Sequence, residues 1–181
     1  MHPRRDGVDP RVYQSVVLAT LLGWGEWRLD FGLSPWRIAA TLGAALLTQW
    51  TCQRLYHRPR SSPSANGARF DPWSALISGL SLCLLLRTNH LSTMIAAAAI
   101  AIASKFMLRV GERHLWNPTN FAIAVMLALG LGWVSPGQWG SAAYFALLVA
   151  GAGGFVVTRA ARLDVTAAFL AWWAALLFGR A

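Results

Sequence analysis

Residues 91–110 read LSTMIAAAAIAIASKFMLRV, an apolar run whose first charged residue is Lys105. The run is about as long as the roughly 20 residues that a straight helix needs to cross the apolar core of a bilayer. Small residues crowd its middle, between Ala96 and Ser104, which suits close approach between helices in a membrane. The stretch therefore predicts a membrane-spanning helix packed tightly against its neighbours.

Six further apolar runs accompany this one, and together they predict an all-α, polytopic transmembrane helical bundle of about seven hydrophobic helices. Some of these helices are short or interrupted, which predicts either discontinuous helices or tilted ones. Among them, the fifth run opens at Asn117–Pro118 and is weakened near its end by Gly130 and Gly132. The seven runs are Val12–Trp27, Pro35–Tyr56, Trp73–Leu86, Leu91–Val110, Pro118–Val134, Gln138–Thr158 and Val165–Phe178.

The composition agrees with a membrane protein. Of 181 residues, 56% are hydrophobic and 13% are charged, whereas a soluble domain is about 25% charged. The formal net charge is +9, but the basic residues lie in short clusters between apolar runs instead of forming a stripe. This distribution argues against a nucleic-acid partner. Cys52 and Cys83 lack metal-ligand spacing, so no metal site is expected.

The basic residues also predict an orientation. With seven crossings, most of them fall on the side of the N-terminal tail, and cytoplasmic loops carry such an excess. We therefore expect a multi-pass protein of the bacterial inner (cytoplasmic) membrane with a cytoplasmic N-terminus. Residues 1–181 would form a single transmembrane domain, with a cytoplasmic tail at 1–11. Residues 57–70 would form a flexible basic loop that contacts anionic membrane lipids.

Two stretches contain the polar residues best suited to a binding site: DPWSALISGLSL (Asp71–Leu82) and KFMLRVGERHLWNPTNF (Lys105–Phe121). Asn117 can cap a helix that starts at Pro118, and the free N–H groups there suit a phosphate or a cofactor oxygen. Lys105 can pair with a flavin or quinone oxygen. The alternatives are an ordinary capped helix and a lysine side chain that extends to water.

In these two stretches the chain resembles the D subunit of the Rnf electron-transport complex and the B subunit of the sodium-translocating NADH:quinone oxidoreductase. Those relatives are generally longer, with two inverted repeats, so the chain corresponds to one repeat or a fragment. The matching residues are Asp71, Ser74, Ala75, Leu76, Ser78, Gly79, Leu80, Lys105, Asn117, Pro118 and Thr119.

The resemblance implies a membrane electron-transport subunit that holds a flavin or quinone between helices and works with other subunits of a redox complex. The cofactor would be non-covalent FMN or riboflavin, or a quinone. The family's Ser-Gly-Ala-Thr motif for covalent FMN is missing, and the nearest string is Ser78-Gly79-Leu80-Ser81. The candidate cofactor-binding residues are Ser78, Lys105, Asn117, Thr119 and Asn120.

Two other functions stay open at this point: a small-solute or ion channel or transporter, and a non-catalytic assembly subunit of a membrane complex. The sequence contains no Ser/His/Asp triad, phosphate-binding loop or paired carboxylates. A role as an oxidoreductase component is therefore compatible with the chain, but no complete catalytic site is expected in it.

Overall fold

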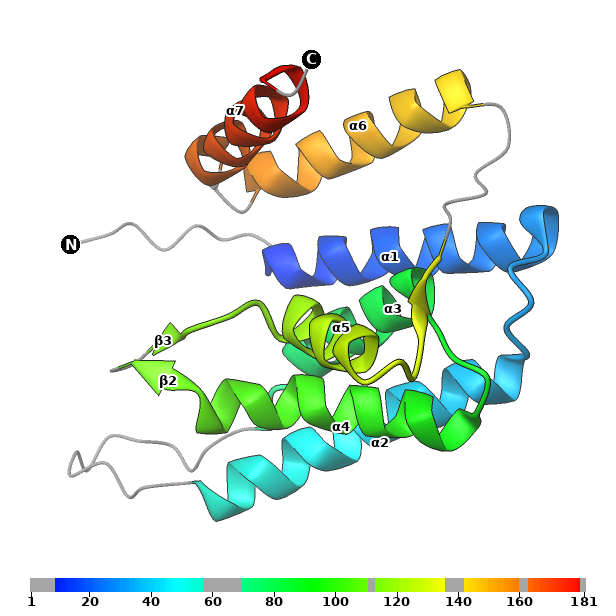
Figure 1. Cartoon of the computed structure of the whole chain (residues 1–181), viewed down its shortest axis with the longest axis vertical. Coiled ribbons are helices and arrows are strands. Elements are labelled where there is room, and N and C mark those ends of the chain that lie inside the picture. Colours follow the sequence, from blue (N-terminus) through cyan, green and yellow to red (C-terminus); the bar gives the residue numbers. More distant parts are fainter. Residues whose placement is uncertain (1–8, 57–69, 111–112, 136–141, 160–162, 180–181) are drawn as a thin grey trace. The chain divides into compact units, whose positions relative to one another are not determined.

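The structure is a computed structural model, and it describes residues 9–56, 70–110, 113–135, 142–159 and 163–179. These residues form seven helices and four two-residue strands (Figure 1), so the all-α part of the prediction is confirmed. The helices are α1 (Pro10–Leu29), α2 (Pro35–Leu55), α3 (Trp73–Leu85), α4 (Leu91–Met107), α5 (Pro118–Ala128), α6 (Ala142–Arg159) and α7 (Leu163–Phe178). The strands are β1 (Leu86–Arg87), β2 (Arg109–Val110), β3 (Arg113–His114) and β4 (Trp133–Val134).

The prediction of a polytopic bundle in the bacterial inner membrane, with a cytoplasmic N-terminus, is wrong. Among the described residues, no helix combines the length and the apolar character that a membrane crossing requires. The apolar helices α3, α4, α5 and α7 have 13, 17, 11 and 16 residues. The longer α1 and α2 have 20 and 21 residues but include polar and charged side chains such as Glu26 and Gln49.

The fifth apolar run shows how the sequence misleads. It extends to Val134, but α5 ends at Ala128 and Gly130 adopts a left-handed φ of 66°. Residues with a side chain rarely adopt this conformation, so glycine suits the turn. The rest of the run forms a turn and β4, and its apolar residues therefore add nothing to the length of the helix.

The described residues cluster into two compact units. Of the described residues, the first unit contains 9–17, 142–159 and 163–179, and the second contains 18–56, 70–110 and 113–135. The prediction of a single domain over residues 1–181 stays a prediction. Residues 1–8 of the expected tail and 57–69 of the expected basic loop lie outside the described residues.

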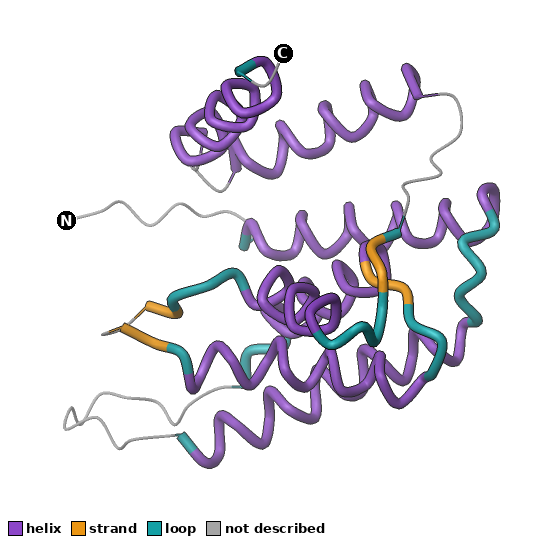
Figure 2. Tube along the Cα trace, in the orientation of Figure 1, coloured by secondary structure: helices purple, strands orange, loops and turns teal. Residues whose placement is uncertain are grey.

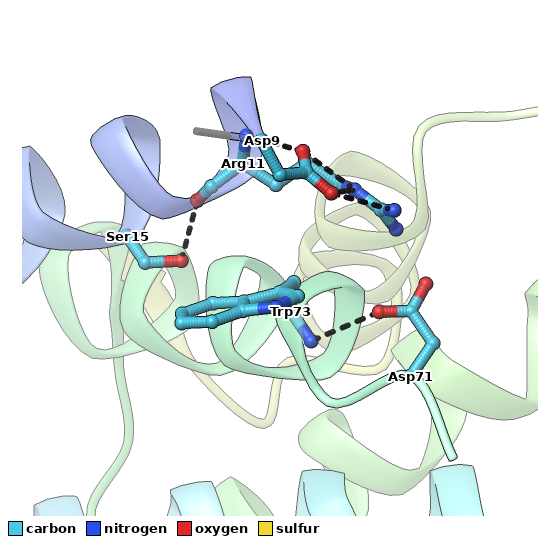
Figure 3. Close-up of polar contacts among 5 residues, drawn as sticks. All are labelled: Asp9, Arg11, Ser15, Asp71 and Trp73. Atoms are coloured by element: carbon cyan, nitrogen blue, oxygen red, sulfur yellow. Dashed lines mark hydrogen bonds and ion pairs between the residues drawn. The ribbon is translucent and has the colours of Figure 1, made fainter. Parts of the chain in front are cut away.

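In the first unit, the head of α1 is capped locally. The Asp9 carboxylate pairs with the Arg11 guanidinium at 3.0 Å and accepts the backbone N–H of Arg11 (Figure 3). The Arg11 side chain holds the pKa of Asp9 below its ordinary value. Tyr13 meets Phe155 of α6 edge to face, with the Arg159 guanidinium over both rings.

In the second unit, α2 and α4 lie side by side and run in the same direction (Figure 1). At one end, the Arg37 guanidinium of α2 donates to the carbonyl of Asn89, just before α4 (2.8 Å). At the other end, the ring of Tyr56, just after α2, lies 6.1 Å from that of Phe106 in α4. α3 runs in the opposite direction, as the bond between Ser74 at its start and Lys105 in the last turn of α4 shows.

Small residues form much of this core, in keeping with the close packing that the sequence predicts. A Cβ on Gly79 of α3 would lie 2.8 Å from the end of the Leu42 side chain of α2, so glycine allows a close approach there. The buried hydrophobic residues of α2 to α5 include Ala45, Ala75, Leu82, Ala97, Ala98, Ala101, Ile102, Ala122 and Met126.

Two short antiparallel ladders join the helices of the second unit (Figure 2). β1 pairs with β4, with Leu86 opposite Val134, and the ladder continues in a 2.7 Å bond from the Ser135 N–H to the Leu85 carbonyl. β2 pairs with β3 in a hairpin between α4 and α5. The hairpin closes with a bond from the Leu115 N–H to the Leu108 carbonyl, so α5 begins beside the end of α4.

Candidate functional site

Lys105 lies in the last turn of α4 and bonds to the first turn of α3. Its Nζ donates to Ser74 Oγ at 2.9 Å. One turn further along α3, Ser78 Oγ donates to the backbone carbonyl of Ser74 at 3.0 Å. Two candidates, Lys105 and Ser78, thus both bond to Ser74, Lys105 at its hydroxyl and Ser78 at its backbone carbonyl. We call this end of the second unit, where α2 and α4 end and α3 begins, the lysine end.

Burial makes the lysine unusual. It lowers the pKa of Lys105 from its ordinary 10.5 to about 8, while the nearby Asp71 and Cys52 oppose that change. Removal from water destabilises the charged form of an amine. The Asp71 carboxylate accepts the backbone N–H of Trp73 at 3.2 Å and so caps α3 (Figure 3). Burial also raises the pKa of the Cys52 thiol, which therefore stays protonated at neutral pH.

Composition singles out the same residue. The chain has sixteen Lys and Arg residues, and Lys105 is the only lysine among them. An arginine side chain stays protonated in proteins, whereas a lysine can lose its proton when it is buried. This count was a signal in the sequence for Lys105, whereas Ser74, which the candidate set omits, is found only through its bond in the structure.

The other three candidates lie at the head of α5. Asn117 Oδ1 accepts the backbone N–H of Asn120 at 3.2 Å, which confirms the predicted cap, and Pro118 takes the first helical position. The Thr119 side chain is buried. Within the described residues, no hydrogen bond links this cap to Lys105 or Ser78. The candidates therefore form two groups at neighbouring helix termini.

The opposite end of the second unit holds a second cation that the candidate set also omits. The Arg87 Nη1 donates to the carbonyl of Cys83 at 2.6 Å and to that of Leu86 at 3.2 Å, which closes the end of α3. Its guanidinium lies over the Phe31 ring, 5.4 Å from the centroid. We call this end, where α3 ends and α2 and α4 begin, the arginine end.

An acidic side chain accompanies that arginine. Burial raises the pKa of Glu26, and both the Leu33 N–H, which donates to Oε1 at 3.3 Å, and the nearby Arg87 oppose the rise. Gly25 leaves room for Phe31, because a Cβ there would overlap with the ring. Backbone oxygens thus hold the half-buried guanidinium through Nη1, while its buried Nη2 has no hydrogen-bond partner among the described residues.

Two polar groups, one in the second half of α2 and one in the last turn of α4, could bond to a ligand N–H donor and to a ligand oxygen acceptor. The ammonium of Lys105 has three N–H donors, and within the described residues only Ser74 accepts from it. On α2, one turn before Cys52, the buried side-chain oxygen of Gln49 has no hydrogen-bond partner. A buried acceptor without a partner is costly, so it favours a ligand donor. A flavin ring offers both groups, and a quinone offers only the oxygens.

The described residues contain no cluster of three or more His, Cys, Asp or Glu side chains that could hold a metal ion. Comparison with models of protein families, with curated proteins and with solved structures gives no match for this chain. The resemblance to the Rnf and sodium-translocating oxidoreductase subunits therefore rests on the quoted motifs alone.

Proposed function

We propose that the chain is a redox subunit of an Rnf-like or Nqr-like electron-transport system that holds a non-covalent flavin, or else a quinone, at the lysine end. The observation that supports this best is a half-buried ammonium, Lys105, whose only bonded partner in the described part of the chain is the Ser74 hydroxyl. When bound, the cofactor supplies the electron-transfer chemistry, and the protein contributes binding and electrostatics.

Four of the five candidate residues, and Gln49 in addition to them, have a defined task in this proposal. Lys105 donates a charge-assisted hydrogen bond to a cofactor oxygen, and Gln49 accepts an N–H from the ring. Thr119 and the free N–H groups at the head of α5, which Asn117 caps, suit the phosphate of FMN. Ser78 holds the Ser74 carbonyl and so fixes the first turn of α3 that positions Lys105.

The first test is flavin binding by the purified full-length chain, titrated separately with FMN, riboflavin and a soluble quinone and followed by visible absorption. We expect the Lys105→Met variant to bind FMN about ten- to hundred-fold more weakly, the usual effect of losing a hydrogen bond to a charged group. After denaturation the flavin should separate from the chain, because the covalent attachment motif is missing.

The matched control is Arg54→Met, which removes an exposed cation from the last turn of α2. It should leave FMN affinity unchanged within about two-fold, because exposed charges contribute little to affinity. Equal affinity in the Lys105→Met variant and the wild type, or no binding of any of the three ligands, would contradict the proposal.

A second candidate function, a non-catalytic assembly subunit, is favoured by α7. Large apolar side chains of this helix are exposed, among them Trp172 at 67% and Phe178 at 80%. Exposed apolar patches of this kind mark interaction sites. If assembly is the function, Trp172→Ser should abolish co-purification with redox partner subunits. Contact of loop 57–70 with membrane lipids stays a prediction, because nearly all of that loop lies outside the described residues.

A further inference from the structure

We propose that Ser74 and Lys105 form a nucleophile and general-base pair that hydrolyses esters of apolar acyl groups. This activity goes beyond cofactor binding, in which Ser74 only helps to position Lys105. The geometry is that of an activated serine: the hydroxyl oxygen and the amine nitrogen lie 2.9 Å apart, on separate helices that hold them together. A nucleophile within hydrogen-bond reach of its base is the arrangement that such catalysis requires, and Ser–Lys pairs are one known form of it.

The lysine can act as a base because it can be neutral. Its pKa is lowered to about 8 by burial, so a useful fraction of the amine is unprotonated near neutral pH. The charged or titratable groups that act on it are Asp71, just before α3, and Cys52 on α2. The other fifteen of the sixteen Lys and Arg residues are arginines, which could not accept the proton.

The position of Ser74 also provides donors for a developing negative charge. The first backbone bond of α3 runs from the Leu76 N–H to the Pro72 carbonyl (2.9 Å). Ser74 and Ala75 precede that bond, and the N–H groups in the first turn of a helix have no partner within the helix. Such donors next to a nucleophile can stabilise the oxyanion formed in acyl transfer.

The reaction balances with water as the only co-reactant. Lys105 Nζ takes the Ser74 hydroxyl proton while Oγ forms a bond to the acyl carbon. The resulting ammonium then gives that proton to the leaving alcohol as the ester C–O bond breaks. Water attacks the acyl-serine in the same way, with Lys105 again as base, and releases the carboxylic acid and free Ser74.

The side chains around the pair favour an apolar acyl group. The rings of Tyr56 and Phe106 lie next to each other at this end of the unit, and Phe106 directly follows Lys105 in α4. Phe70 and Met107 are 43% and 66% exposed. Because exposed apolar side chains gain from covering by an apolar chain, longer acyl esters should react faster than acetate.

The test uses the full-length chain with a fluorophosphonate, which reacts with activated serines, and with p-nitrophenyl acetate, butyrate and decanoate. We expect one phosphonate adduct, located on Ser74 by peptide mass spectrometry. Ser74→Ala, Lys105→Met and Lys105→Arg should each lower labelling and ester hydrolysis by about 10²- to 10⁴-fold, the usual contribution of a positioned base. Lys105→Arg keeps the charge but cannot act as a base.

Ser104→Ala is the matched control, because it removes a buried hydroxyl next to Lys105 that bonds only to its own helix, at the Ala101 carbonyl. It should keep wild-type labelling within about three-fold. The wild-type rate should rise about ten-fold per pH unit and level off above about pH 8. No adduct on the wild-type chain, an adduct elsewhere, or full activity in the folded Lys105→Arg variant would overturn the proposal. Labelling of Ser74 and the FMN titration are independent measurements on the wild-type chain, so this proposal and the proposed redox function can each fail without the other.

Discussion

At each end of the second unit a half-buried cation bonds to α3, Arg87 at its end and Lys105 at its start, and these two cations are held differently. At the arginine end, Arg87 donates to two carbonyl oxygens, lies over an aromatic ring and has Glu26 nearby. At the lysine end, Lys105 has one hydroxyl partner, and its pKa lies near 8. Both cations are partly buried, but an arginine keeps its proton, so Arg87 has a structural role. A lysine can lose its proton when it is buried, so Lys105 becomes a group that titrates near neutral pH.

The largest effect should come from removing the structural cation. Arg87→Leu leaves the carbonyls of Cys83 and Leu86 without their donor and Glu26 without its neighbour. We expect the free energy of unfolding to fall by about 2–4 kcal/mol, because hydrogen bonds to charged groups are worth about 1.5–3 kcal/mol each. Denaturant titration measures this.

Lys105→Met provides the contrast, since it removes one hydrogen bond and a buried charge that is costly to keep. It should change stability by less than about 1 kcal/mol at pH 7. If the two substitutions cost the same, the distinction between a structural and a titratable cation fails.

The next effect is a dependence of stability on pH that arises from the ionisation of Lys105 at the lysine end. The pKa of Lys105 is about 8 in the folded chain and near its ordinary 10.5 when unfolded. Between these values the unfolded chain binds the extra proton, so stability should rise with pH, by at most about 1.4 kcal/mol per unit.

Two thiols limit the pH window in which this rise can be seen. The pKa of Cys83 is raised by burial to about 11 and that of Cys52 is also raised, so above about pH 9 their ionisation in the unfolded chain lowers stability. The measurement is therefore the difference between wild type and Lys105→Met in denaturant titrations at pH 7, 8 and 9. A difference that does not change with pH would mean that Lys105 keeps its proton.

The smallest effects concern helix caps at the two ends. At the lysine end, Asn117→Ala should cost about 0.5–2 kcal/mol, because the Asn117 side chain accepts the Asn120 N–H. At the arginine end, Ser34 precedes α2 but makes no side-chain cap bond. Ser34→Ala should therefore leave the unfolding free energy nearly unchanged. Thermal unfolding of both variants compares the two caps, and equal losses would show that the Asn117 bond contributes nothing.

The sequence predicted the helices well and their environment badly. The starts at Pro35, Trp73, Leu91 and Pro118 agree with the structure, because proline and capping residues act locally and are visible in sequence. The membrane prediction failed because apolar residues were counted across turns, as at Gly130. The two short ladders depend on pairing between distant residues, for which a two-residue strand leaves no sequence pattern.

The candidate site was also predicted in part. The Asn117 cap follows from local chemistry, and Lys105 was selected by its motif. Ser74, Gln49 and Arg87 were not selected, because their roles arise from burial and from contacts between separate helices. Ser74 on α3 and Lys105 on α4 are far apart in sequence. Helical periodicity relates only residues of one helix, so it cannot show that these two side chains meet.

The β1–β4 ladder has a consequence for how the chain folds. Leu86 can pair with Val134, and Ser135 can bond to Leu85, only after α4 and α5 have brought the chain back to the end of α3. Closing such a long loop has an entropic cost that contacts within a single helix do not have. During synthesis the ladder cannot form until Ser135 has left the ribosome, so the carbonyls at the end of α3 should be among the last backbone groups of this unit to gain protection from hydrogen exchange.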